Sequence, residues 1–275
     1  MTFFDLERPE HAYMFAFIQA DGHLTQGVGN KGRLAVELSA RDAPILEEFQ
    51  RLCPFNSSIR YRTRTTNFKA DHTSVMWTVC AREFREELQA LGLPVGRKSE
   101  IVAPPTVPFS GRDYLRGLID ADGSVGRTAQ DLPFVGLTTK SDAIASFFTD
   151  YAEALSGSER RIFRRNSRDG IYNIVYTREE AVAIASDVYY TGCLSLPRKQ
   201  SGAALAGSWR RPAAMKRVTR RSWTPEEDTI LLGSPTLADA AKTLRRSASS
   251  CQVRRWRLLN LTADERSIGR RFPAP

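Results

Sequence analysis

Two segments of this chain repeat one pattern, and each segment ends in the tripeptide Ala-Asp-Gly. The first segment spans residues 13–22 and the second spans 114–123, so Asp21 and Asp122 stand 101 positions apart. This repetition predicts a duplicated module in which each copy contributes one carboxylate to a shared place. We therefore expect a paired-carboxylate site where two similar halves meet.

A common order of expected elements continues after each segment. In each copy, alternating apolar and polar residues predict strands, and apolar residues at helical spacing predict helices. The predicted order is a motif helix, two strands, a helix, two strands and a helix. Lys98 and Lys199, again 101 positions apart, close the two copies, and a Pro- and Gly-rich connector separates them. The elements expected after the motif helices are strands over 33–39, 57–66 and 73–80 with helices from Asp42 and over 82–91, then strands near 124–129, 133–138, 159–167 and 171–177 with helices near 141–156 and 178–190.

Small residues recur four positions apart in both motif helices. Residues four apart share a helix face, and small side chains there let two backbones approach closely. We therefore expect the motif helices to pack on each other, and Gly22 and Gly123 to end them in the left-handed conformation common after a helix. The expected interface residues are Ala16, Ala20, Gly117 and Ala121.

The helix ends are an unfavourable place for Asp21 and Asp122. A helix C-terminus disfavours a negative charge by about 0.3–1 kcal/mol, and two anions about 4 Å apart repel by roughly 4 kcal/mol at an effective dielectric constant of about 20. The pair must therefore share a proton or bind divalent cations. Because the motif offers only oxygen ligands, it favours Mg²⁺ over zinc.

These residues resemble the motif of the LAGLIDADG homing endonucleases. Residues 115–123 match that nonapeptide at eight of nine positions, and residues 14–22 match it more loosely, with Gln19 in place of the first acid. In the family the second acid is catalytic and binds metal, which assigns both roles to Asp21 and Asp122. The resemblance implies an α+β fold in which two pseudo-symmetric αββαββα halves form a saddle over double-stranded DNA.

The same resemblance implies an activity and its cofactor. The expected protein is a monomeric meganuclease that hydrolyses both strands of a long asymmetric DNA target with Mg²⁺. Mn²⁺ or Ca²⁺ could take the place of Mg²⁺, with Ca²⁺ expected to be non-productive. Lys98 and Lys199 fall where the family often places a basic residue that polarises water or stabilises transition-state charge, so they are implied to be catalytic.

Alternating arginines in the strand over 57–66 share one face of the expected sheet. Such a face suits DNA reading in the major groove, where Arg pairs with guanine. Other basic residues of the two copies are expected to join these contacts. The expected DNA contacts of the two halves are Arg41, Arg60, Arg62, Arg64, Lys140, Arg161 and Arg165.

The net charge of +9 is located entirely in the C-terminal part of the chain. Residues 209–275 hold 15 Lys and Arg against 6 Asp and Glu, whereas residues 1–208 hold 25 of each. Such a basic segment favours nucleic acid as the partner, because phosphate neutralisation supplies affinity that does not depend on sequence.

Beyond a basic linker, residues 223–228 resemble the opening of Myb/SANT-like helix-turn-helix domains. A second helix is expected over 237–244 and a third over about 249–259. Val253 and Trp256 are expected to share the core face of the third helix, which would turn its arginines towards DNA. The expected DNA contacts of the linker and third helix are Arg217, Arg220, Arg221, Arg254, Arg255 and Arg257.

These patterns also exclude some classes of protein. No apolar run approaches the roughly 20 residues of a membrane-spanning helix, and the widely spaced cysteines argue against a disulfide framework or a zinc knuckle. We expect a cytoplasmic protein that acts on nucleoid DNA in a bacterial or phage setting, without an obligate protein partner. An RNA intron maturase and a non-cutting DNA-binding regulator remain open as alternatives on the same fold.

The expected divisions are half 1 (1–103), a connector (104–111), half 2 (112–206), a basic linker (207–221), a Myb/SANT-like domain (222–261) and a tail (262–275).

Overall fold

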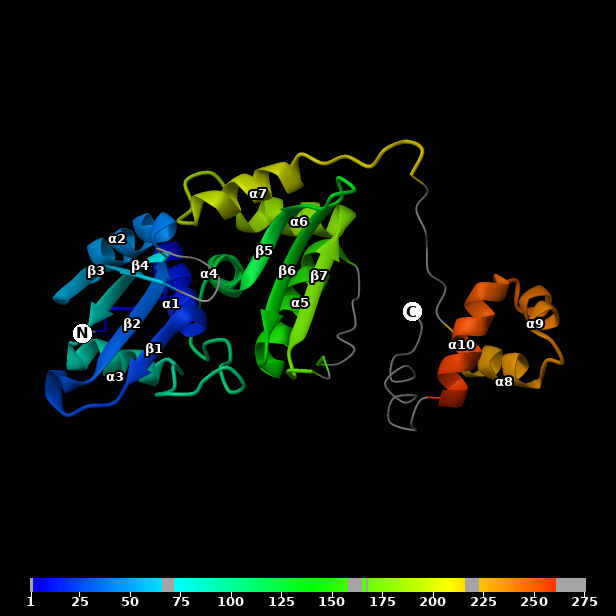
Figure 1. Cartoon of the computed structure of the whole chain (residues 1–275), viewed down its shortest axis with the longest axis horizontal. Helices are drawn as coiled ribbons and strands as arrows, with labels where there is room; N and C mark the ends of the chain where they lie inside the picture. Colours follow the sequence, from blue (N-terminus) through cyan, green and yellow to red (C-terminus); the bar gives the residue numbers. More distant parts are fainter. Residues whose placement is uncertain (1, 66–71, 158–164, 167, 216–222, 261–275) are drawn as a thin grey trace. The chain divides into compact units, whose positions relative to one another are not determined.

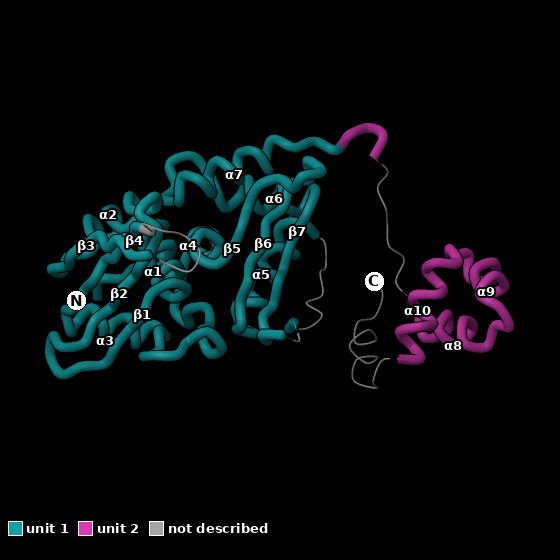
Figure 2. Tube along the Cα trace, in the orientation of Figure 1, with its two compact units in different colours: residues 1–211 teal, residues 212–275 magenta. Residues whose placement is uncertain are grey.

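The computed structural model describes residues 2–65, 72–157, 165–166, 168–215 and 223–260. The chain divides into two compact units, residues 1–211 and residues 212–275 (Figure 2). The larger unit has an α+β fold made of two similar halves, and the smaller unit is all-α (Figure 1). Within the described ranges no helix is both long and apolar enough to cross a membrane. The finer divisions expected from the sequence stay predictions.

The first half begins with the motif helix α1 (Pro9–Asp21). The strands described in this half form one antiparallel sheet in the order β1-β2-β4-β3. The alternation in β2 buries Leu34 and Val36 and exposes Arg33 and Glu37, so one sheet face packs on the core and the other meets solvent. The other elements of this half are β1 (Gly22–Thr25), η1 (Gly29–Lys31), β2 (Arg33–Ser39), η2 (Ala40–Asp42), α2 (Ala43–Leu52), β3 (Ser57–Arg64), β4 (His72–Val79) and α3 (Arg82–Ala90).

The second half repeats this order from its motif helix α4 (Gly111–Asp122). The sheet register repeats as well, because Gly22 pairs with Val36 and Gly123 pairs with Leu137. The described strands are antiparallel in the order β5-β6-β7, and the strand expected near 159–167 falls mostly outside the described residues. The other elements are β5 (Gly123–Arg127), β6 (Pro133–Thr139), α5 (Asp142–Ser156), β7 (Tyr172–Thr177), α6 (Arg178–Val188) and α7 (Pro197–Gly207), the last not expected from the sequence.

Helices α1 and α4 pack against each other where the two halves meet. At Gly117 an added Cβ would lie 2.5 Å from the Tyr13 carbonyl oxygen and 2.7 Å from the Ala16 Cβ. Only a residue without a side chain allows this approach. Ala20 and Ala121 are partly buried against the same core.

Gly22 and Gly123 end these helices differently from the expectation. Their φ angles are −73° and −110°, so both residues are extended and the left-handed prediction was wrong. A Cβ at Gly22 would lie 2.4 Å from the Ile18 carbonyl oxygen, and one at Gly123 would lie 2.6 Å from the Gly136 carbonyl oxygen. Glycine is needed here because the chain passes directly from helix to strand and leaves no room for a side chain.

The smaller unit contains α8 (Pro225–Gly233), α9 (Leu237–Leu244) and α10 (Ala248–Asn260). A capping box starts α8: the Glu227 N–H donates to the Thr224 hydroxyl, and the Thr224 N–H donates to the Glu227 carboxylate. The buried core residues are Leu231, Ala240, Leu244, Cys251 and Leu258.

The expected core face of α10 was wrong. Val253 and Trp256 are 50% and 60% exposed. Cys251 and Leu258, two helical turns apart, are buried instead and define the face that packs on the other helices. Trp256 lies five positions after Cys251, which places it on the outer side of the helix.

Candidate active site

Asp21 and Asp122 end the two packed helices, and both side chains are exposed. Loss of hydration raises the pKa of Asp21 to about 6, with repulsion from Asp122 as the next cause. Loss of hydration also raises the pKa of Asp122, against the opposing fields of Lys98 and Lys199. Solvent thus reaches both carboxylates, while the surrounding protein removes part of their hydration.

Lys98 and Lys199 bind the backbone carbonyl groups at the ends of the motif helices. Each ammonium donates to carbonyls at the end of its helix and opposes the negative end of the helix dipole. The Ile18 and Ile119 carbonyls also accept the backbone N–H of Gly22 and Gly123. Loss of hydration lowers the pKa of each amine to about 8. The accepting carbonyls are those of Ile18 (3.3 Å), Gln19 (2.6 Å) and Ala20 for Lys98, and of Ile119 (2.9 Å) and Gly123 for Lys199.

Two tyrosines connect the motif helices just behind the carboxylates. The Tyr13 hydroxyl donates to Asp120 at 2.7 Å, and the Tyr114 hydroxyl donates to Gln19. Each tyrosine therefore reaches from its own motif helix to the other one. This pair of contacts was not expected from the sequence, although both the tyrosines and their acceptors show the same 101-position spacing.

The identity of residue 19 follows from the partners that surround it. Asp120 accepts hydrogen bonds from the Tyr189 hydroxyl at 2.6 Å and the Leu196 N–H at 2.6 Å, so a carboxylate fits. Gln19 instead donates its amide N–H to the Ala103 carbonyl at 2.8 Å. An ionised carboxylate has no donor, and the departure of this copy from the nonapeptide is thereby explained.

Two further polar contacts connect the halves at the starts of α2 and α5. Arg198 donates to the Asp42 carboxylate at 3.1 Å, and the Asp42 side chain makes no capping hydrogen bond at the start of α2. The Ser141 hydroxyl donates to the Val102 carbonyl at 2.5 Å and caps α5 by accepting from the Ile144 N–H. The relative position of the two carboxylates is therefore set by contacts from both halves.

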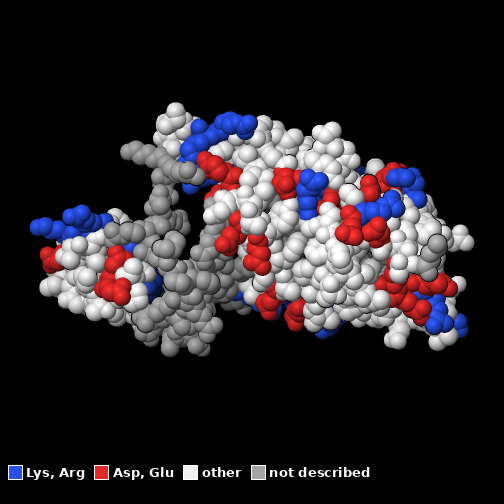
Figure 3. All heavy atoms as spheres, turned by 180° about the vertical axis from the view of Figure 1, so that it is seen from behind, with Lys and Arg blue, Asp and Glu red and all other residues white. Residues whose placement is uncertain are grey.

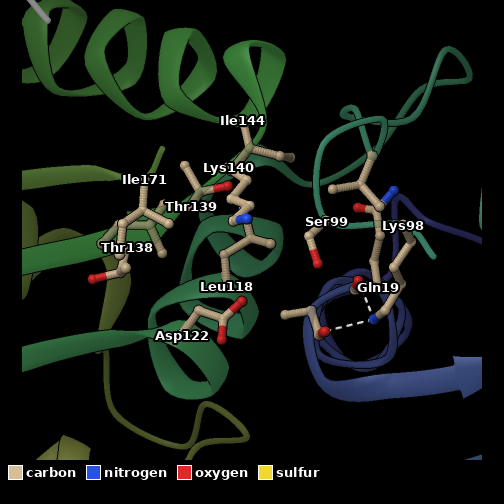
Figure 4. Close-up of a pocket in the computed structure, with 13 residues that line it drawn as sticks. Gln19, Lys98, Ser99, Leu118, Asp122, Thr138, Thr139, Lys140, Ile144 and Ile171 are labelled. Carbon is tan, nitrogen blue, oxygen red and sulfur yellow. Dashed lines mark hydrogen bonds between the residues drawn. The ribbon is translucent and has the colours of Figure 1, made fainter. Parts of the chain in front are cut away.

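A pocket of about 240 Å³ lies beside Asp122 between the two halves (Figure 4). The first half contributes Lys98 and Ser99 to its lining, and the second contributes Asp122 and Lys140. In Figure 4 the ammonium of Lys98 is turned to the end of α1, while Lys140 lies on the side of α4. The Glu100 carboxylate is 4.0 Å from the Lys140 ammonium.

The arginines of β3 lie in its exposed second half, where Tyr61 and Thr63 between them are exposed as well. Arg60, Arg62 and Arg64 are exposed, and alternate residues of a strand share one face. Arg64 also pairs with Glu37 of β2 at 3.3 Å. The side of the larger unit seen in Figure 3 carries acidic as well as basic side chains.

The remaining expected DNA contacts of the two halves differ in their surroundings. The Arg41 side chain is 69% exposed and lies 3.8 Å from the Asp42 carboxylate. Arg165 pairs with Asp142 at 3.2 Å. Arg161 lies outside the described residues.

In the smaller unit, Arg254 is committed to an internal ion pair. Its guanidinium donates to both oxygens of Asp228 at 2.7 and 2.6 Å, and the Asp228 side chain is 3% exposed. The expectation that Arg254 turns away from the core was therefore wrong. Arg255 is half-buried and Arg257 is exposed on the same helix. The linker residues Arg217, Arg220 and Arg221 lie outside the described part of the chain.

The donor set at the helix ends fits Mg²⁺. Mg²⁺ is usually held by one or two carboxylates and completes its shell with water and substrate phosphates. Asp21 and Asp122 supply two such carboxylates, and the described residues contain no cluster of three or more His, Cys, Asp or Glu that could form a closed metal site. Loss of hydration raises the pKa of both carboxyl groups, and a bound cation would offset this cost of their ionised forms.

Comparison with known proteins bears on the second half and on the fold. Residues 111–189 match the family model of the LAGLIDADG-like domain. The homing endonuclease I-WcaI, solved bound to its DNA recognition sequence, has a similar fold, with a TM-score of 0.50 and 12% sequence identity. The match covers 74% of this chain and 88% of the endonuclease. The N-terminal LAGLIDADG domain of WhiA is 11% identical with a TM-score of 0.42 over 76% and 87%.

A tRNA-splicing ligase RtcB of Methanopyrus kandleri is 27% identical over 198 residues. That match spans 62% of this chain but only 19% of the ligase, so the chain spans about a fifth of the length of this curated relative. The likeness therefore concerns one part of that protein. The chain contains a LAGLIDADG-like domain, within a fold that it shares with the homing endonuclease I-WcaI.

Proposed function

We propose that this protein is a site-specific double-strand DNA endonuclease that depends on divalent metal ions. The observation that carries the proposal is the pair of solvent-exposed carboxylates, Asp21 and Asp122. They lie at the ends of two packed helices, one from each of two similar halves. The similarity in fold to a homing endonuclease solved on its DNA recognition sequence supports the proposal. Mg²⁺ is the metal that the donor set fits best, and a single chain supplies both carboxylates.

The reaction is hydrolysis of a phosphodiester in each strand. A water oxygen forms a bond to phosphorus, the bond to the 3′ oxygen breaks, and that oxygen receives a proton. Mg²⁺ held by Asp21 and Asp122 would activate the water and stabilise the leaving oxygen. Lys98 and Lys199 hold the helix ends, so the carboxylates are positioned before DNA binds.

Recognition of the target is assigned to the sheets and to the smaller unit. The exposed arginine face of β3 offers guanidinium groups for guanine edges and phosphates. The smaller unit, with three helices in its described residues 223–260 and a capping box at the start of the first, supports a Myb/SANT-like helix-turn-helix role that extends the DNA contact. Arg255 and Arg257 remain its candidates for phosphate contacts.

The test is a cleavage selection on a randomised DNA library with and without Mg²⁺. We expect one family of long asymmetric sites to be cut in both strands only when the metal is present. Asp122→Asn should abolish double-strand cleavage of the selected site and keep DNA affinity within about threefold, since the carboxylate acts on the reaction and not on recognition. Binding of DNA without any cutting would instead indicate a regulator, and binding of structured RNA without cutting would indicate a maturase.

A further inference from the structure

The strand register shows which side chains of the first sheet point away from the core. Val36 of β2 and Trp77 of β4 are register partners, and both are fully buried. Because successive side chains of a strand point to opposite faces, their neighbours lie on the other side of the sheet. There Glu37, Met76 and Arg60 form one row across β2, β4 and β3. We call the side of each sheet that points away from its core the outer face.

Arginine side chains are available on the outer face of the first sheet. Arg62 and Arg64 share this face with Arg60, since the three alternate along β3. Arg64 pairs with Glu37 at 3.3 Å. Arg60 and Arg62 are exposed, and their guanidinium groups have no hydrogen bond or ion pair within the residues that the structure describes. Two guanidinium groups therefore keep their donors for a partner.

The outer face of the second sheet has a different chemistry. Through the 101-position repeat, Phe134 takes the place of Arg33, and Thr138 takes the place of Glu37. Asn173 is the register partner of Thr138 and is exposed beside it. Within the three strands described for this half, no charged side chain lies on the outer face. The two outer faces thus differ in the residues they carry.

Arg127 is charged and belongs to β5, but it lies on the core side of that strand. It follows Val125 by two positions and so shares its side, and the register partner of Val125, Val135, is fully buried. The Arg127 guanidinium donates to the Leu205 carbonyl at 2.9 Å and to the Asp131 carboxylate at 2.8 Å. The charge of Arg127 is therefore held by the protein and is absent from the outer face.

Asn173 is held in an orientation that suits adenine. The Thr138 hydroxyl donates to its side-chain oxygen at 3.2 Å, and this oxygen keeps a second lone pair. The amide nitrogen has no acceptor within the described part of the chain. Such an amide can accept from N6 of adenine and donate to N7. Val175, which is 38% exposed two positions further along β7, offers apolar surface that suits the methyl group of thymine.

We propose that the two halves of the DNA target differ in base composition, with guanines specifying the half-site under the first sheet and A·T pairs specifying the half-site under the second. The inference deepens the proposed nuclease function and rests on it. Each available guanidinium of β3 can donate to both O6 and N7 of a guanine, whereas the second sheet presents an amide and apolar groups that match adenine and thymine. The base preference of each half-site follows from the residues of one outer face.

The experiment sequences the sites that the protein cuts from a randomised DNA library in Mg²⁺, and the cut divides each site into two half-sites. One half-site should be enriched in guanine and the other in A·T pairs. Arg62→Ala should lower the preference for guanine by about tenfold at one position of the first. Asn173→Asp should change the preference from adenine to cytosine at one position of the other. A carboxylate accepts from N4 of cytosine and has no donor for N7 of adenine.

Arg51→Ala is the matched control, since it removes an exposed arginine from α2, where that side chain pairs with Glu48 at 2.6 Å. This control should leave every base preference unchanged. Guanine enriched equally in both half-sites, an unchanged preference in Asn173→Asp, or effects of Arg62→Ala and Asn173→Asp in the same half-site would overturn the inference while cleavage persists. A wild-type protein that cuts no DNA would overturn the proposed function itself.

Discussion

Replacing Asp21 with Asn should stabilise the protein in the absence of metal. The pKa of Asp21 rises from 3.8 to about 6, and each pKa unit corresponds to about 1.4 kcal/mol. A carboxylate shielded from water would therefore cost the folded state about 3 kcal/mol. Because the side chain is exposed, solvent screens most of this, and we expect a gain of about 1 kcal/mol in the free energy of unfolding.

The gain should depend on pH in a defined direction. Folded Asp21 binds its proton more tightly than the unfolded chain does, so wild-type stability falls as pH rises from 3.8 to about 6. Asn cannot lose a proton at this position. The difference between variant and wild type should be small near pH 4 and complete above about pH 7.

Urea unfolding in EDTA at several pH values measures this difference, and Mg²⁺ is then added. Mg²⁺ should raise the stability of the wild type, as any ligand of the folded state does, and should raise that of Asp21→Asn much less. Asp150→Asn, at an exposed aspartate of α5, is the control and should change neither quantity. A variant less stable than wild type in EDTA at neutral pH would refute the reasoning.

Three further perturbations test other parts of the structure. Gly117→Ala places a methyl 2.5 Å from the Tyr13 carbonyl oxygen and should lower the free energy of unfolding by about 1–3 kcal/mol. Gly111→Ala, with no neighbouring atom closer than 3.8 Å, should be near neutral, and equal effects in urea unfolding would contradict the close packing of α1 and α4. Arg254→Ala leaves buried Asp228 without its cation and should destabilise the smaller unit by about 3 kcal/mol. Hydrogen exchange in α8 and α10 reports this loss, and unchanged protection would argue against the ion pair. Removing residues 212–275 should weaken DNA binding and flatten its dependence on salt, measured by gel shift at several salt concentrations, whereas an unchanged slope would mean that this unit contacts no phosphates.

The duplication could be predicted from the sequence because corresponding residues of the two copies are a constant 101 positions apart. The two Ala-Asp-Gly segments share a separation with the two lysines, and the same separation recurs in the sheet register of both halves. Strand alternation placed β2, β3, β4 and β6 within one or two residues of their observed ends, because a half-buried strand must alternate. The capping box at Thr224 is equally local, since its partners lie three residues apart.

The partners of the polar side chains could not be read in this way. Lys98 binds carbonyls about 80 positions earlier in the chain, Gln19 binds a carbonyl 84 positions later, and Asp42 binds Arg198 across the two halves. A side chain's type shows that it needs a donor or an acceptor, but many groups in the chain could supply it. The choice among them is made only when the elements pack.

The core face of α10 shows the same limit for apolar residues. Val253 and Trp256 are a plausible core pair by spacing, yet Cys251 and Leu258 are buried instead. A short helix can present more than one face to a core, and the neighbouring helices select it. Sequence alone therefore determined the repeat, the paired carboxylates and most helices and strands of this protein. Tertiary packing decided which charges are bound and which stay available, because burial and hydrogen bonding depend on groups far away in the chain.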